Sequence, residues 1–318
     1  MMVTPIRLDE LGEEGKKLFT MARALRRALG YSAIGTAAGF VISPDVREFV
    51  TIGALGSIST VWLRFFNHTH LHRGHILSEA LANTGGTPAG PPRRGADPNQ
   101  VPRGVITVSN HASTVDDPGI IAVCQPYAAV WKPKRMRYVL CADGACFRKQ
   151  TMLQRALGVL AEAGRALPIT RGGGMDQPSM RKLPALLDRG EWVHMFPSGK
   201  TNPDPSTLAP FKRGVGSTVL DCVRPPTIIP FYHHGVQSVM PPPSDPDVMY
   251  VAPSTGNHIH ILFGEPISVD DLMPKKPRRL LSAEERDAVS EAIANRMHAA
   301  VDALRKEMLA SLEAERAA

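Results

Sequence analysis

Hydrophobic positions in the middle of the chain fall into two alternating patterns between residues 104 and 271. Short apolar runs rich in β-branched and aromatic residues predict buried strands, and they lie at residues 105–108, 138–140, 192–196, 227–232 and 258–263. Segments with helical spacing of apolar residues lie near 150–163, 178–189 and 214–223. Strands that alternate with helices in this way are typical of an α/β fold.

A long helix is predicted after residue 282. Ser282 and Glu285 have the spacing of a capping box, in which each side chain bonds the other residue's backbone amide. Apolar residues then recur at helical spacing, so one face of the helix should pack against the rest of the protein. They are Val289, Ile293, Met297, Val301, Leu304, Met308 and Leu312.

Two uncharged stretches follow a basic amphipathic segment near the start of the chain, at residues 28–44 and 49–63. As a helix, the second stretch would reach about 22 Å, short of a hydrocarbon core roughly 30 Å thick. This length favours helices that anchor the protein at one membrane interface over a helix that spans the membrane. A helix buried in the protein core is the alternative.

Histidines are concentrated just after this stretch, at His68, His70, His72 and His75. On a helix, His68, His72 and His75 would share a face, as metal ligands can. Only Glu79 offers a nearby carboxylate, and short histidine-rich tracts are common without a metal. We therefore expect no metal site.

The composition also indicates how the chain is divided. Residues 84–103 are rich in proline and glycine, as in a loop or linker. We expect an amphipathic, membrane-anchoring region at 1–83, this loop at 84–103, the main domain at 104–273 and a C-terminal helix at 274–318.

The net charge favours an anionic partner. Lys and Arg number 37 against 30 Asp and Glu, which gives a formal charge of +7. Aromatic residues are only 6% of the chain and no nucleic-acid-binding motif is present. An anionic membrane surface fits this charge equally well, so composition leaves the two partners open. With the motifs described below, we expect an anionic membrane surface and no nucleic acid.

The cysteines show no sign of pairing. Cys124, Cys141, Cys146 and Cys222 form neither a C-x-x-C motif nor a paired framework. Buried, unreactive thiols are expected.

The candidate chemistry begins in the segment SNHASTVDDP, residues 109–118. His111 and Asp116 follow the predicted strand 105–108, and Asp117 with Pro118 resembles the N-cap and first position of a helix. A turn between strand and helix could bring the imidazole and the carboxylate together. Such a pair can act as a general base, because the carboxylate orients the ring and stabilises its protonated form. A solvated loop histidine beside an ordinary N-cap is the alternative.

Two further loops carry residues that suit phosphate. Arg171 and Gly172 follow a short apolar segment, and Ser198, Gly199 and Lys200 follow the predicted strand 192–196. Arginine and exposed backbone amides both bind phosphate, and loops at strand ends are common ligand sites in α/β folds. Lys212 and Arg213 are further candidates, with a solvated basic surface as the alternative reading.

Taken in this order, the blocks resemble those of the glycerolipid acyltransferases, which have N-H-x-x-x-x-D, an arginine–glycine block, F-P-E-G and an apolar–proline block. The resemblance covers about residues 60–270. It implies a mixed sheet flanked by helices, with His111 as general base and Asp116 orienting it. It also implies substrate-binding residues, namely Asn110, Arg171, Gly172, Ser198, Gly199, Lys200 and Lys212. Ser198 replaces the family's glutamate, which leaves the headgroup preference open.

Within this family, the chain is similar to the mitochondrial phospholipid–lysophospholipid transacylases. The similarity lies in V-S-N-H-x-S-x-x-D-D-P from Val108, in Trp192-Val193-His194 and in Phe211-Lys212. It implies transfer of acyl chains between phospholipids, including cardiolipin, without coenzyme A. It further implies monotopic attachment to mitochondrial membranes facing the intermembrane space, and no cofactor. A homo-oligomer is left open.

Two other functions compete with this interpretation. One is an acyltransferase that uses the same base but takes its acyl chain from acyl-CoA. The other is a non-enzymatic lipid-binding or scaffolding protein with the same fold. The intact pair of His111 and Asp116 argues against this second function. The chain has no G-x-S-x-G motif, which argues against a serine acyl-enzyme.

Overall fold

The computed structural model describes residues 43–84, 103–147, 152–241 and 253–317. The chain divides into two units, Met1–Val50 and Thr51–Ala318. The second unit holds the sheet and all the sites considered below.

The sheet of the described residues has seven strands in the order β1-β7-β6-β2-β5-β3-β4. Neighbouring strands are parallel except for β6 and β7, which are antiparallel. The strands are β1 (His68–His72), β2 (Val105–Val108), β3 (Tyr138–Ala142), β4 (Ala166–Ile169), β5 (Trp192–Met195), β6 (Thr227–His234) and β7 (His258–Phe263). Because β2 to β5 are parallel, their carboxyl ends meet at one edge of the sheet.

Helices cover both faces of this sheet. Successive strand residues point to opposite faces, so Val105 belongs to one buried core and Ile106 to the other. One core packs against α7 (Pro178–Leu187), α8 (Gly214–Asp221) and α10 (Ala283–Ala317). The other packs against α2 (Pro44–Phe65), α3 (His75–Ala82), α4 (Ile121–Val123) and α9 (Val236–Val239). Two further helices, α5 (Asp143–Cys146) and α6 (Met152–Ala163), lie between β3 and β4 in the chain.

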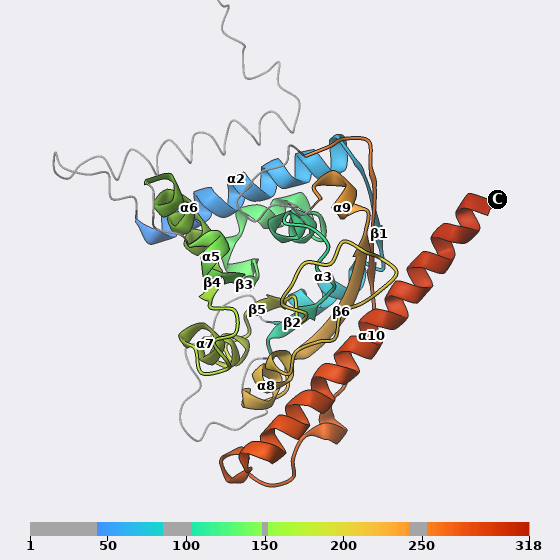
Figure 1. The fold of residues 1–318 in the computed structure, drawn as a ribbon. Coiled ribbons are helices and arrows are strands. Elements are labelled where there is room, and N and C mark those ends of the chain that lie inside the picture. The colour runs from blue at the N-terminus through green and yellow to red at the C-terminus, as the bar shows by residue number, and fades with distance from the viewer. Residues whose placement is uncertain (1–42, 85–102, 148–151, 242–252, 318) are drawn as a thin grey trace, which may run out of the picture. The chain divides into compact units, whose positions relative to one another are not determined.

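The long helix α10 runs past α8 and along β6 (Figure 1). The predicted capping box starts it: the Glu285 amide donates to Ser282 Oγ at 3.2 Å, and the Ser282 amide to Glu285 Oε2 at 2.7 Å. Ile293, Met297 and Val301 are fully buried in the core. A Cβ atom on Gly216 of α8 would lie 1.8 Å from the carbonyl oxygen of Ser290. Only glycine therefore allows the two helices to approach so closely.

The predicted α/β class and mixed sheet are confirmed, as are strands over 105–108, 138–140, 192–196, 227–232 and 258–263. The helical interpretation of the histidine tract is wrong, because residues 68–72 form the edge strand β1. Asp117 does not cap a helix. Its backbone is extended and its carboxylate pairs with Arg137. Strand β4 was not predicted.

One cysteine also differs from expectation. Cys141 on β3 is disulfide-bonded, so the prediction of unpaired thiols is wrong there. A disulfide needs two Cβ atoms about 4 Å apart, and sequence spacing does not reveal such proximity. Cys124 and Cys222 are buried free thiols, and burial raises the pKa of Cys222 well above its usual value.

The predicted membrane-anchoring stretch at 49–63 lies within α2, and the stretch at 28–44 lies almost wholly outside the described residues. In the part of the chain that the structure describes, no helix is both long and apolar enough to cross a bilayer. The expected division of the chain at residues 83, 103 and 273 stays a prediction.

Candidate active site

The segment after β2 folds back on itself and brings two predicted residues together. His111 Nδ1 lies 2.8 Å from Asp116 Oδ2. The intervening turn is closed by the amide of Asp116, which donates to the carbonyl of Ser113. Asp116 is fully buried, whereas the His111 side chain keeps 21% of its surface exposed. One end of the pair is thus held inside the protein and the other meets solvent.

The Asp116 carboxylate is held by backbone as well as by the histidine. The amides of Ala112 and Ser113 donate to Oδ2 at 2.6 and 3.0 Å, the same oxygen that meets His111. An ionised carboxylate offers only acceptors, which matches these donors. With Nδ1 engaged by Asp116, Nε2 is the His111 nitrogen that can take a proton from a substrate.

Phe196 fixes the plane of the His111 ring from the side of β5. The two rings stack with centroids 4.2 Å apart, and the edge of the His194 ring supports Phe196 with centroids 4.4 Å apart. The amide of Asn202 donates to the His111 carbonyl at 2.7 Å. The turn that holds His111 and Asp116 is therefore restrained by the loop that follows β5.

A second histidine, which the sequence did not single out, lies behind the pair. His233 on β6 is fully buried, with Nε2 3.6 Å from Asp116 Oδ2. Burial lowers the pKa of His233, although the Asp116 charge opposes this shift. An uncharged His233 leaves the carboxylate available to stabilise a proton on His111. The sequence offered one indication of His233: this residue directly follows the predicted strand 227–232.

Asn110 joins these elements. Its Nδ2 donates to the carbonyl of His233 at 2.9 Å, and its Oδ1 accepts from the amide of His233 at 3.0 Å. The side-chain amide is therefore engaged in holding the turn after β2 against β6. Asn110 is therefore better placed to position the His111–Asp116 turn than to contact a substrate directly.

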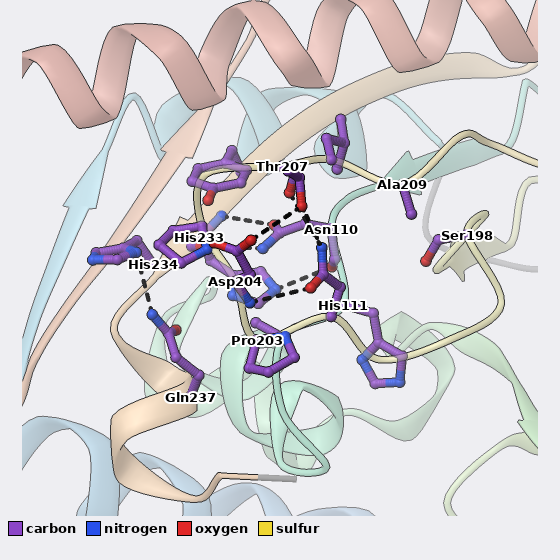
Figure 2. Close-up of a pocket in the computed structure, with 15 residues that line it drawn as sticks. Asn110, His111, Ser198, Pro203, Asp204, Thr207, Ala209, His233, His234 and Gln237 are labelled. Carbon is purple, nitrogen blue, oxygen red and sulfur yellow. Dashed lines mark hydrogen bonds between the residues drawn. The ribbon is translucent and has the colours of Figure 1, made fainter.

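A pocket opens beside this turn, and the His111 ring lies at its margin, apart from Asp204 and His233 (Figure 2). The far wall is the loop after β5, which α10 holds in place because Arg305 Nη1 donates to the carbonyl of Ser206 at 2.8 Å. The lining residues are Asn110, His111, Ala112, Ser198, Asn202, Pro203, Asp204, Pro205, Thr207, Leu208, Ala209, Tyr232, His233, His234 and Gln237.

The predicted phosphate-binding residues are distributed along the same edge of the sheet. Ser198 lines the pocket, and its hydroxyl donates to the carbonyl of Lys200 at 3.0 Å. Gly199 has a positive φ of 68°, and a Cβ there would lie 2.8 Å from Lys212 Nζ. Lys200 and Lys212 are both exposed. The structure thus places Ser198, Gly199 and Lys200 in one turn at the pocket, with Lys212 packed against Gly199.

Arg171 and Gly172 are farther along this edge. They follow β4, which is three strands from β2 in the sheet. Arg171 is exposed, and Gly172 has a positive φ of 80°, as expected for the predicted glycine turn. Arg213, another candidate, is paired with Asp287 of α10. It is therefore a poorer phosphate ligand than the sequence indicated.

Comparisons with known proteins agree with this arrangement. A family model described as Acyltransferase matches residues 94–234. N-acylphosphatidylethanolamine synthase of Arabidopsis thaliana is 33% identical over 166 residues, 52% of this chain and 56% of that protein. Tafazzin of Drosophila melanogaster is 26% identical over 249 residues, 78% of this chain and 58% of that protein. The chain thus spans somewhat more than half the length of these relatives.

Among solved structures, the 1-acyl-sn-glycerophosphate acyltransferase of Thermotoga maritima has a TM-score of 0.42 and 17% sequence identity, covering 88% of this chain and 91% of that one. The family match runs from before β2 to the end of β6 and so includes the histidine–aspartate turn and Ser198. The chain is thus similar to tafazzin over most of its length, and the acyltransferase family model matches its middle part.

Proposed function

We propose that this protein is a phospholipid acyltransferase in which His111 is the general base and Asp116 orients it. The observation that carries the proposal is the 2.8 Å contact between His111 Nδ1 and a fully buried carboxylate. His111 Nε2 takes the proton of a lysophospholipid hydroxyl as that oxygen attacks the carbonyl carbon of the donor ester. The bond to the leaving alkoxide then breaks, and the imidazolium returns the proton to it.

For the acyl donor we propose a second phospholipid, so that the reaction is a transacylation that needs no coenzyme A. The exposed apolar residues of α2 support this proposal, because the same helix packs against the helical segment that directly follows the His111–Asp116 turn. A Cβ on Gly119, three residues after Asp116, would lie 3.2 Å from Leu63, and Arg64 Nη2 donates to the Val123 carbonyl at 2.8 Å. A donor held in the bilayer could reach the site beside this helix. We propose Arg171, Gly172, Ser198, Gly199, Lys200 and Lys212 as headgroup-binding residues, with Asn110 positioning the turn.

Purified protein in liposomes should move a labelled acyl chain from phosphatidylcholine to monolysocardiolipin, and back, without coenzyme A. The exchanged esters are nearly equivalent, so no activated thioester is required. Parallel reactions would contain acyl-CoA as donor, or phosphatidylethanolamine as acceptor because the Arabidopsis relative is named for N-acylation of that lipid. Strict dependence on acyl-CoA would favour the competing acyltransferase. If no acyl transfer occurred in any of these reactions, the proposal would be wrong.

We propose that the protein attaches to one face of the membrane through the exposed apolar side chains of α2. Ile58 and Phe65 are 65% and 80% exposed. Basic residues lie beside this helix, since Trp131 packs against Gly53 and the exposed Lys132, Lys134 and Arg135 follow Trp131. Mitochondrial membranes facing the intermembrane space are the proposed location.

High salt should weaken binding to anionic liposomes without releasing the protein, since each basic residue contributes about 1 kcal/mol near the surface and apolar burial supplies the rest. Replacing Ile58 and Phe65 together with serine should reduce liposome binding at least fivefold in a flotation assay. Leu280→Ser is the matched control, because Leu280 is 61% exposed but lies outside α2. Complete release of the unmodified protein by salt, or equal loss in the control, would contradict this mode of attachment.

A further inference from the structure

Histidines from two distant parts of the sequence form a stacked row on the edge of the sheet. Strand β1 pairs in parallel with β7, so that His68 lies opposite His258 and His70 opposite His260. The rings of His68 and His258 stack at 4.8 Å, those of His70 and His258 at 5.4 Å, and those of His70 and His260 at 4.6 Å. The alternating pattern H-x-H in each strand places these side chains on one face.

Three of these rings direct nitrogen atoms toward a common point. One ligand nitrogen from each of His70, His258 and His260 lies within 4.8 Å of the other two. His70 Nε2 and His258 Nδ1 are already 3.1 Å apart. In a tetrahedral zinc site, bonds of about 2.0–2.1 Å place ligand nitrogens roughly 3.3 Å apart. Small rotations of exposed side chains therefore suffice to reach ligand geometry.

We propose that His70, His258 and His260 bind one divalent transition-metal ion of the kind that prefers imidazole, such as Zn²⁺. The remaining coordination position faces solvent and takes water. Such an ion would add metal–ligand bonds between the edge strand β1 and β7 to the backbone pairing, the stacked rings and the His70–His258 hydrogen bond that connect them. The site is separate from the His111 pair, and its proposal does not depend on acyltransferase activity.

The test is titration of tag-free protein with ZnCl₂ in isothermal calorimetry, together with Co²⁺ absorption spectra that report tetrahedral imidazole ligation. We expect one Zn²⁺ per chain, and a rise in Tm on its addition. His70→Gln, His258→Gln and His260→Gln should each weaken binding at least tenfold and remove the rise in Tm. His75→Gln is the control, because His75 is exposed at the start of α3 and outside the cluster.

His70 and His258 are exposed, so their variants should fold even if His260→Gln does not, and the Tm without zinc checks this. Equal zinc affinity in the unmodified protein and in the His70 and His258 variants would overturn the proposal. So would a loss of affinity in His75→Gln as large as in those two. An unmodified protein that binds no zinc would show that the row is only a stack of polar side chains on a sheet edge.

Discussion

Replacing His111 with alanine should slow acyl transfer by roughly 10²–10⁴-fold, the usual contribution of a general acid–base group. The free energy of unfolding should change little, because the ring is partly exposed and its contacts are with Asp116 and one face of Phe196. The measurement is the initial rate of acyl transfer in liposomes at equal bound protein. A urea denaturation curve of the same preparation checks folding.

The matched control for this variant is His75→Ala, which removes an exposed histidine outside the candidate active site. It should retain the rate of the unmodified protein. Near-normal turnover by His111→Ala would exclude His111 as the base. A large loss in both variants would instead indicate that the assay responds to folding or to membrane attachment.

Replacing Asp116 with alanine should affect both activity and stability. Without the carboxylate, His111 loses its orienting partner, and the rate should fall by roughly 10²–10⁴-fold. The buried amides of Ala112 and Ser113 would also lose their acceptor. Each unsatisfied buried donor costs about 1–3 kcal/mol, so the free energy of unfolding should drop by about 2–6 kcal/mol. Urea denaturation measures this loss.

Asp116→Asn separates the two effects. Its amide oxygen can still accept from both backbone amides, but the side chain has no charge to stabilise a protonated His111. The free energy of unfolding should therefore fall less than in Asp116→Ala, while most of the activity is lost. If Asp116→Asn were as active as the unmodified protein, the carboxylate would have only a structural role.

The strands and the catalytic turn could be predicted because their signals are local. The run at 105–108 is apolar and β-branched, and the spacing of His111 and Asp116 makes sense only with a turn between them. The histidines of β1 were misread, since a five-residue strand at a sheet edge has mostly exposed side chains and lacks an apolar pattern. Only pairing with β7, nearly two hundred residues later, determines its conformation.

Two details of the site depended on similar long-range contacts. Asp117 precedes Pro118, as an N-cap residue often does, but its carboxylate instead pairs with the buried Arg137, twenty residues later in the chain. His233 lies close to Asp116 only because β6 pairs with β2 in the sheet. The position of His233 after a predicted strand indicated where it lies along the chain, but no local pattern pairs His233 with Asp116 or Arg137 with Asp117. Contacts of this kind explain why the pairing of His111 with Asp116 could be predicted and its surroundings could not.

The dependence of the core on α10 has a consequence for synthesis. The core beneath β6 and α8 is completed by residues of α10, which are made after the strands described here. They are Ile293, Met297, Val301, Leu304 and Met308. Domains generally fold as units during translation, beginning with N-terminal parts. Here the part of this sheet face that α10 covers would stay exposed until residue 308 had emerged from the ribosome. While the ribosome still holds that segment, the nascent chain exposes apolar surface that a chaperone, or the membrane itself, can bind.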